Sequence, residues 1–391
     1  MQTFTIKHKD KKTNARIGVL NTKKTKVETP FFMPVATKAN VKYISSEDLK
    51  EMKAKAIISN ALILYLRPGT KVIKSLGGIG KFMNYSGVNF TDSGGFQMYS
   101  KEIYISSNDN GVLFKCPFSG KKEFITPEKD MQIQLDIGSD VAMCLDTMPL
   151  YHHSKQDIQE AVRKTSLWAK RCKLYHNEKQ KNTKKKQLLF GIIQGGIYSD
   201  LRKISANDLI SLNFDGYSIG GLGLGETWEQ EMKILNLCKK IIPENKPVYL
   251  MGIGNPVEIL EAISHGVDIF DSRMPTMMAR RGTLFTSKGK LRLMNKKHEF
   301  DKSPLDKDCN CFVCKNYSRA YLRHQLIQDE GLGKRLVSYH NLFFLQNLLS
   351  EAKKHIKLGD FNKFKEKIKK AYEENSNSKK EKTTINQLQK E

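Results

Sequence analysis

Eight short runs rich in β-branched and aromatic residues recur along this chain, and amphipathic helical stretches lie between most of them. Such alternation is typical of a parallel sheet whose strands are joined by helices. The runs are FFMPVAT (31–37), AIISNALI (56–63), VNFTD (88–92), DVAMCLD (140–146), LLFGIIQ (188–194), GYSIGG (216–221), VYLMGI (248–253) and VDIFD (267–271). The pattern predicts an α/β protein with an irregular (β/α)8 TIM barrel, and a doubly wound open sheet is the alternative.

The carboxyl ends of five runs favour the barrel. Polar residues or glycines stand there, at Asp92-Ser-Gly-Gly, Asp146, Gln194-Gly-Gly, Gly220-Gly221 and Asp271. Each alone is equally explained as a turn or a helix cap. Barrel active sites are assembled from these strand ends, so five together indicate a catalytic face.

Local signals predict several connecting elements. Helices are expected from Ser46, from Ser154 and after Asn255, and the first two stretches open with a serine and carry an acid in the first turn, as an N-cap predicts. The long connection between Asp92 and Asp140 alternates apolar and polar residues around an Asn-Gly pair, which predicts a small antiparallel hairpin.

A cysteine-rich segment predicts one structural zinc ion. Cys309, Cys311 and Cys314 are closely spaced, and His340 follows downstream. Zinc favours tetrahedral thiolate and imidazole ligands, and a complete Cys3His set leaves no vacant position for catalysis. His324 is an alternative fourth ligand, although it lies in a helix-like run where packing or capping explains it equally well.

Composition narrows the partners. The chain of 391 residues has 66 Lys and Arg against 41 Asp and Glu, a net charge of +25, which favours a polyanion such as nucleic acid. A genome-wide lysine bias would produce the same excess. We expect no membrane association, because no apolar run approaches the roughly 18 residues of a span, and a cytoplasmic address, because no signal peptide is evident. GGLGLGE (220–226) lacks the spacing of a dinucleotide loop.

Seven motifs resemble those of the tRNA-guanine transglycosylase (queuine tRNA-ribosyltransferase) family, bacterial type, in order and spacing. They are TDSGGFQ (91–97), LDTMP (145–149), GIIQGG (191–196), GYSIGGLGLGE (216–226), YLMGIGNP (249–256), FDSRMPT (270–276) and the CxCxxC…H set. The resemblance runs from about Phe4 to Tyr372. We therefore expect a catalytic barrel over 1–300, an inserted zinc-binding subdomain with C-terminal helices over 301–373, and a disordered basic tail over 374–391.

The resemblance implies exchange of guanine at wobble position 34 for a 7-deazaguanine, preQ1 or queuine, in queuosine biosynthesis. The implied tRNAs are those for Asp, Asn, His and Tyr, with GUN anticodons, and the implied assembly is a homodimer. Asp271 would be the nucleophile of a covalent enzyme–RNA intermediate, with Asp92 as general acid/base. Two displacements on a carboxylate retain the stereochemistry of the glycosidic bond. Asp268 is the alternative nucleophile.

The family pattern also implies binding residues. Those expected to hold the base are Asp92, Ser93, Gly94, Gly95, Phe96, Asp146, Gln194, Gly220, Gly221, Leu222 and Met251. Phe96 and Met251 would sandwich the base, and core packing is the alternative for both. Those expected to contact RNA are Gly252, Ile253, Gly254, Asn255, Pro256, Val257, Glu258, Thr276, Met277, Met278, Ala279 and Arg280.

Several positions depart from the usual bacterial pattern. They are Phe96, Thr147, Met148, Gly223, Leu224 and Met277. A remodelled pocket would suit queuine rather than preQ1, and Met277 replaces an arginine that would contact the anticodon. The rival functions are a non-catalytic tRNA-binding accessory subunit, an archaeal-type enzyme acting at another tRNA position, and a carboxylate glycosidase. The presence of Asp92, Asp146 and Asp271 argues against the accessory subunit, and the chain length argues against the archaeal-type enzyme. The positive charge and the zinc motif argue against the glycosidase.

Overall fold

The computed structural model describes residues 2–148, 153–184, 186–223 and 225–388. All eight predicted strands form one parallel sheet. In spatial order they are β4 (Phe31–Pro34), β14 (Ile269–Ser272), β13 (Val248–Leu250), β12 (Gly216–Ile219), β11 (Leu188–Ile193), β10 (Val141–Met143), β6 (Val88–Asp92) and β5 (Ala56–Asn60). A parallel bridge between Val35 and Ile58 joins the two edges, with Ala36 N donating to Ile58 O at 2.7 Å. This closure confirms the barrel and rules out the open doubly wound sheet.

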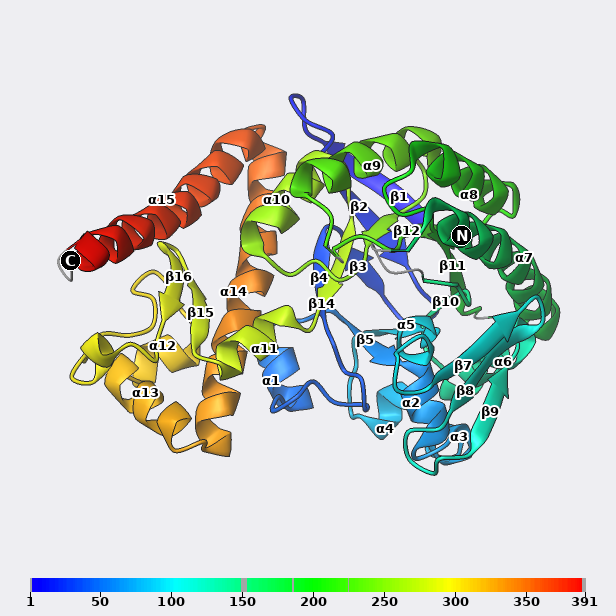
Figure 1. Ribbon diagram of the computed structural model, residues 1–391, viewed down its shortest axis with the longest axis horizontal. Coiled ribbons are helices and arrows are strands. Elements are labelled where there is room, and N and C mark those ends of the chain that lie inside the picture. The colour runs from blue at the N-terminus through cyan, green and yellow to red at the C-terminus, as the bar shows by residue number, and fades with distance from the viewer. Residues whose placement is uncertain (1, 149–152, 185, 224, 389–391) are drawn as a thin grey trace.

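Helices surround the strands, and Figure 1 shows α7, α8 and α9 side by side on the outside of the barrel. The barrel helices are α1 (Ser46–Glu51), α2 (Ala61–Leu66), α3 (Thr70–Ser75), α4 (Ile79–Phe82), α5 (Gly95–Met98), α6 (Pro127–Ile137), α7 (Lys155–Lys179), α8 (Ser199–Ser211), α9 (Trp228–Ile241), α10 (Pro256–Ser264) and α11 (Met274–Arg280). Ser154 is the N-cap of α7 as predicted, and Asn255 is the N-cap of α10. The cap of α1 is Ser45, one residue before the predicted Ser46.

Two antiparallel sheets are added to the barrel. The predicted hairpin forms with the Asn-Gly pair at its turn, and a third strand extends it, giving β7 (Tyr104–Asn108), β8 (Gly111–Lys115) and β9 (Lys122–Ile125). The N-terminal sheet consists of β1 (Phe4–Lys9), β2 (Arg16–Asn21) and β3 (Lys26–Glu28).

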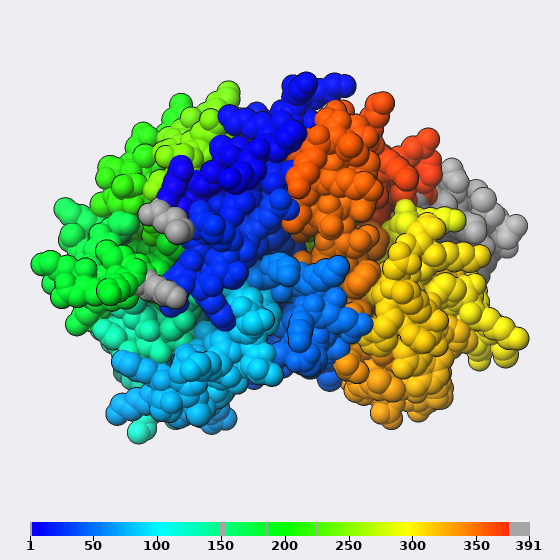
Figure 2. Space-filling model, turned by 180° about the vertical axis from the view of Figure 1, so that it is seen from behind, coloured from blue at the N-terminus to red at the C-terminus, as the bar shows by residue number. Residues whose placement is uncertain are grey.

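The C-terminal elements lie beside the barrel. They are β15 (Thr283–Thr286), β16 (Gly289–Arg292), η1 (Lys296–His298), α12 (Phe312–Asn316), α13 (Arg319–Ile327), α14 (Gly331–Leu358) and α15 (Phe361–Leu388). Figure 2 shows α14 in orange between the blue N-terminal part and the yellow segment that carries the cysteines. Arg335 of α14 donates to both oxygens of Asp48 in α1, at 3.2 and 2.6 Å. The division at residues 300 and 373 remains a prediction. Among the described residues, no helix is long and apolar enough to cross a membrane.

Aromatic rings fill the interior of the barrel. Phe90 makes edge contacts with Phe31, Phe190 and Tyr249, with ring centroids 6.2, 5.8 and 6.3 Å away. Edge-to-face pairs at this spacing add about 0.5–1.5 kcal/mol beyond the area they bury. Because Tyr249 also reaches the carboxyl rim of the barrel, this packing holds the rim in position.

One buried ion pair ties the N-terminal sheet to the barrel. The Arg16 guanidinium donates to both oxygens of Asp268, at 3.0 and 2.6 Å, and both side chains are excluded from solvent. Asp268 also accepts from Val248 N at 2.8 Å, and Arg16 donates to the carbonyl oxygens of Glu244 and Lys246. Both charges are therefore satisfied, and removal of either partner would leave the other buried without compensation.

We predict that Arg16→Met lowers the free energy of unfolding by about 3–5 kcal/mol, because it strands the Asp268 carboxylate in the interior. Denaturant unfolding measures the loss. The matched control is Lys9→Met, which breaks the exposed pair between Lys9 and Glu244 and is expected to cost at most about 1 kcal/mol. Equal, small losses for the two variants would contradict the assignment.

Candidate active site

Asp92 ends β6 at the carboxyl rim of the barrel. Its Oδ1 accepts from the backbone of Gly94 at 3.1 Å, and it keeps partial contact with solvent. The pKa of Asp92 is raised to about 7 by burial and, to a smaller extent, by the neighbouring Asp271 carboxyl, while donors on Gly94, Asn60 and Ala61 act in the opposite direction. A carboxyl with a pKa near neutrality can both give and take a proton.

Asp271 lies in β14 at the same rim, and two donors converge on one of its oxygens. The Tyr249 hydroxyl donates to Oδ1 at 2.6 Å and Gly252 N donates to it at 3.0 Å. Burial raises the pKa of Asp271, and these two hydrogen bonds lower it. The Asp271 side chain is only partly exposed at the rim. Asp268 is completely buried against Arg16, so it cannot reach a substrate.

Asp146 and Gln194 form a buried polar pair. Gln194 Nε2 donates to Asp146 Oδ2 at 2.7 Å, and Ser93 Oγ lies 3.4 Å from Oδ1. Burial raises the pKa of Asp146 more than the bonds from Gln194 and Ser93 lower it, so that the pKa is about 6. Within the described part of the chain, the buried Gln194 Oε1 has no hydrogen-bond partner.

Glycines let the backbone approach this pair. A Cβ on Gly221 would lie 2.7 Å from Gln194 Oε1, and one on Gly95 would lie 2.8 Å from Asp146 Oδ1. Gly221 also has a φ of +62°, which L side chains rarely adopt. Gly220 and Leu222 flank it, and Leu222 is buried. The predicted base-binding residues on β6, β10, β11 and β12 thus come together at one rim.

The predicted stacking residues differ in exposure. The Phe96 side chain, which α5 presents, is 53% exposed, so core packing does not explain it. Met251 follows β13, is half-buried and packs against the core. An exposed aromatic ring beside buried carboxylates is the arrangement expected of a face that takes a flat base.

A buried polar network supports Asp92 from behind, and the sequence analysis did not single it out. Gln134 accepts from Thr91 Oγ1 at 2.8 Å, donates to Asp130 Oδ2 at 2.8 Å, and bonds both backbone groups of Met143. Asp130 is fully buried, and burial raises its pKa well above the usual range, as do Asp92 and Asp146. Because a raised pKa favours the neutral form of Asp130, this side chain adds no negative charge behind Asp92 and Asp146.

The predicted RNA segments flank Asp271. In the first, Gly252 is exposed, Asn255 caps α10 and accepts from Val257 N, and Glu258 accepts from Asn255 at 3.0 Å. In the second, on α11, the partly exposed side chains are Met277, Met278 and Arg280. Five of the residues expected to contact RNA are buried and cannot reach it through a side chain. They are Ile253, Gly254, Pro256, Thr276 and Ala279.

The departures from the family pattern surround the same rim. Thr147 is buried, and its backbone N donates to Thr165 Oγ1 at 3.0 Å. Met148 is partly buried and Gly223 has a φ of +77°. Leu224, and Pro149 of the LDTMP motif, lie outside the described residues.

The predicted metal ligands converge. The Sγ atoms of Cys309, Cys311 and Cys314 lie 3.8, 3.6 and 3.4 Å from His340 Nδ1, and all four ligand atoms fall within 4.8 Å of one another. His340 Nε2 faces the Phe285 carbonyl oxygen at 2.8 Å, which orients the ring so that Nδ1 points to the thiols. The group contains His340 and not His324, which is exposed on α13. Such a donor set fits a tetrahedral divalent metal.

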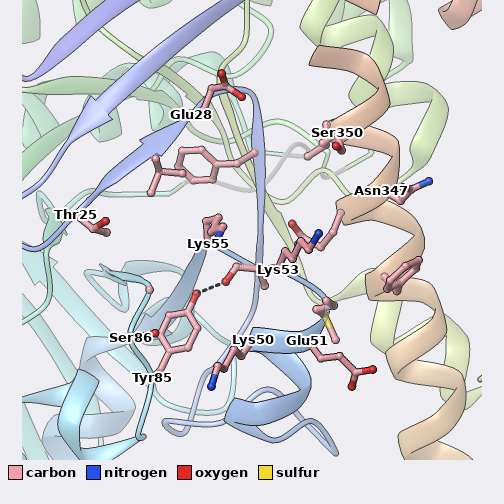
Figure 3. A pocket seen from close by; sticks show the side chains of 18 of the residues that line it. Thr25, Glu28, Lys50, Glu51, Lys53, Lys55, Tyr85, Ser86, Asn347 and Ser350 are labelled. Atoms are coloured by element: carbon pink, nitrogen blue, oxygen red, sulfur yellow. Dashed lines mark hydrogen bonds between the residues drawn. The ribbon is translucent and has the colours of Figure 1, made fainter. Parts of the chain in front are cut away.

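A separate groove of about 680 Å3 lies at the other end of the barrel (Figure 3). It is lined by Lys50, Lys53 and Lys55 and by residues that precede β4, β5 and β6, and there Tyr85 donates to the Ala54 carbonyl at 2.8 Å. Barrel enzymes use the carboxyl ends of their strands, so this amino-terminal groove is not the active site.

The fold and site define the class: a (β/α)8 barrel with aspartates gathered at the carboxyl ends of its strands and a Cys3His cluster alongside. Comparison with known proteins agrees. The chain matches the family "Queuine tRNA-ribosyltransferase" over residues 10–374. It is 43% identical to the queuine tRNA-ribosyltransferase of Halothermothrix orenii, covering 95% of this chain and 98% of that protein. It is 45% identical to those of Bacillus subtilis (90% and 92% covered) and Fusobacterium nucleatum (94% and 98%). The chain therefore belongs to the queuine tRNA-ribosyltransferase family.

The sequence analysis missed three residues of the site besides the network at Gln134. They are Asn60, Ala61 and Tyr249. Asn60 and Tyr249 lie inside predicted strands, and Asn60 stands where β5 ends, a strand-end signal that the pattern contained. Tyr249 gave no such signal, because only the packed barrel shows that its hydroxyl reaches Asp271.

We predict that Asp271→Asn lowers the pKa of Asp92 below about 7, because a neighbouring negative charge is removed. The value should stay above the ordinary one, since burial is the largest cause of the shift. Titration of 13C-labelled aspartate carboxyls by NMR measures it. Asp208→Asn, at an exposed site, is the matched control and should change nothing; an unshifted Asp92 in the first variant would refute the coupling.

Proposed function

We propose that this protein exchanges guanine at wobble position 34 of GUN-anticodon tRNAs for a 7-deazaguanine, through a covalent enzyme–RNA intermediate, in queuosine biosynthesis. The observation that carries the proposal is the pair of coupled carboxyls at one rim. Asp92 has a pKa raised to about 7. Burial raises the pKa of Asp271 as well, but the donors on Tyr249 and Gly252 oppose that shift and favour its ionised form. Family membership and the names of the relatives support the same activity.

The two carboxyls would take different roles in the first displacement. The free oxygen of ionised Asp271 attacks C1′ of the ribose, and the glycosidic bond to guanine breaks with its electron pair going to the base. Neutral Asp92 gives a proton to the departing guanine. Tyr249 and Gly252 hold the attacking carboxylate in place through its other oxygen.

The second displacement reverses the first. Asp92, now ionised, takes a proton from the incoming base, whose nitrogen attacks C1′ and releases Asp271 as a carboxylate. Two inversions give net retention at C1′. Asp92 returns to its neutral form, so each exchange leaves the protein unchanged.

The base pocket offers matching donors and acceptors. Asp146 would accept from the N1–H and exocyclic amine of a guanine-like base, and Gly221 N with the Gln194 amide would donate to its O6. Gln194 already donates one N–H to Asp146. Phe96 would stack on the base from its exposed position, opposite Met251; such stacking contributes about 1–3 kcal/mol. Whether preQ1 or queuine enters is decided by the room beside Thr147, Met148 and Gly223.

The Cys3His cluster would hold one zinc ion, whose four ligands leave no position for a substrate. Its role is structural: it ties α12 to α14, and α14 packs against α11 beside the nucleophile. The proposed partners are the tRNAs for Asp, Asn, His and Tyr, and a second copy of the chain in a cytoplasmic homodimer.

The exchange is tested with tRNA that carries labelled guanine at position 34. Either preQ1 or queuine is expected to release the label, and the faster base is the substrate. Asp271→Ala should abolish release, and Asp92→Asn should reduce it by about 10²–10⁴-fold, the usual contribution of a general acid/base. The matched control is Asp208→Asn.

Denaturing electrophoresis tests the covalent step. The wild-type protein should retain labelled tRNA when the incoming base is withheld, and Asp271→Asn should not. Release of no label under any condition, with tRNA binding intact, would leave a non-catalytic tRNA-binding accessory subunit as the function.

We predict that Cys314→Ser abolishes tight zinc binding and lowers the unfolding temperature, because it removes one of four ligands from a folded site. Elemental analysis and thermal unfolding measure the two effects. Cys116→Ser, a buried cysteine outside the cluster, should keep one zinc ion per chain. Full zinc content in Cys314→Ser would contradict the ligand set.

A further inference from the structure

The loop between β4 and α1 is held in an unusual backbone conformation. Ala39 and Tyr43, neither of them a glycine, have φ values of +57° and +67°. Each such residue costs about 1–3 kcal/mol and persists only where its surroundings impose the conformation, which is common at ligand-binding sites. In this loop the surroundings of Tyr43 are cationic.

Three positive groups from three elements surround the Tyr43 ring. Lys42 Nζ lies 5.7 Å from the ring centroid, and Arg280 Cζ and Lys334 Nζ each lie 5.9 Å from it. Lys42 belongs to the loop, Arg280 ends α11, and Lys334 lies in the first turn of α14. All three are within the range of cation–π attraction, so the ring holds together charges that would otherwise repel. We call Tyr43, Lys42, Arg280 and Lys334 the Tyr43 cluster.

The cluster carries more positive charge than its neighbours compensate. Across the described residues, the one carboxylate in ion-pair range of these cations is Asp329, which bonds Lys334 at 2.7 Å and is itself 85% exposed. Arg281 and Arg273 add further positive charge near Arg280. The buried Nη1 of Arg280 has no partner among the described residues. Cations gathered in this way favour an anionic ligand.

The cluster lies on the catalytic face. β4 and β14 are adjacent, with Asp271 opposite Met33 and Ser272 opposite Pro34, so the chain leaves both strands at the rim that holds Asp271. The loop with Tyr43 continues from β4, and α11 continues from β14. The cations therefore lie on the same face of the barrel as Asp271, in contrast to the lysines of the groove in Figure 3 at the other end.

We propose that the Tyr43 cluster binds a backbone phosphate of the RNA strand next to the nucleotide held over Asp271. Arg280 and Lys334 supply the charge and the donors, and Tyr43 orients them. Arg280 is the sole cation among the residues expected to contact RNA, and Lys42 and Lys334 lie outside those segments. The inference rests on the proposed action on tRNA and adds three residues from other elements to its RNA surface.

The test measures binding of a GUN anticodon stem-loop RNA to the full chain over a range of salt concentrations, without free base. Lys334→Gln is expected to weaken binding on the order of fivefold and to reduce the salt slope by about 0.7–0.9, the loss of one phosphate contact. Tyr43→Leu should also weaken binding, whereas Tyr43→Phe keeps the ring and should bind as wild type.

The matched control is Lys74→Gln. Lys74 pairs with Asp136 at 2.7 Å, the same distance as Lys334 and Asp329, but it lies on α3 away from the cluster. It should leave the affinity and the salt slope unchanged. Lys42→Gln, at an exposed loop position, provides a second test if Tyr43→Leu unfolds, and it too should reduce the salt slope.

Two results would overturn the inference. Unchanged RNA affinity and salt slope in Lys334→Gln and Lys42→Gln would show that no phosphate binds there. If these variants differed from wild type in sedimentation mass but not in RNA affinity, the surface would be one that contacts a second copy of the chain. Both results leave the proposed exchange intact, whereas wild-type protein that bound no anticodon RNA would contradict the exchange as well.

Discussion

Closure of a parallel sheet is the constraint on which the rest of this structure depends. Because all eight strands run in one direction and the bridge between Val35 and Ile58 joins the edges, every strand ends at the same rim. Asp92, Asp146 and Asp271, far apart in the chain, meet there. Burial at such a rim raises the pKa values of all three carboxyls, and the neighbours of each one modify that shift differently.

The environment of each aspartate assigns its role. Asp268 and Asp271 lie close together in the sequence, yet Asp268 is neutralised by Arg16 and Asp271 faces the site with two donors on one oxygen. Asp130 lies behind the rim, bonded to Gln134, with a pKa raised by burial. These two carboxyls behind the rim are therefore paired or neutral, which leaves unpaired negative charge to the carboxyls at the rim.

Helix α14 connects the metal cluster with the catalytic rim. His340 contributes to the cluster, and the adjacent Asn341 donates to the Pro275 carbonyl and accepts from Phe285 N. Pro275 belongs to α11, which follows the nucleophile strand. A metal ion bound at the cluster would therefore stabilise the position of α11 through these contacts. Arg335 also fixes α14 to α1 through Asp48.

The sequence by itself determined the strand count, the Asn-Gly hairpin, the family and the three cysteine ligands. These features depend on local periodicity, turn chemistry and ligand spacing, which are properties of the chain. The structure chose the closed barrel over the open sheet and His340 over His324. Tertiary structure decided which of Asp268 and Asp271 is buried against an arginine, that Phe96 is exposed, and that Tyr249, Asn60 and Gln134 support the carboxyls. It also gathered Lys42, Arg280 and Lys334 around Tyr43. Such contacts join residues from separate strands and helices, and no local pattern specifies which of them will pack together.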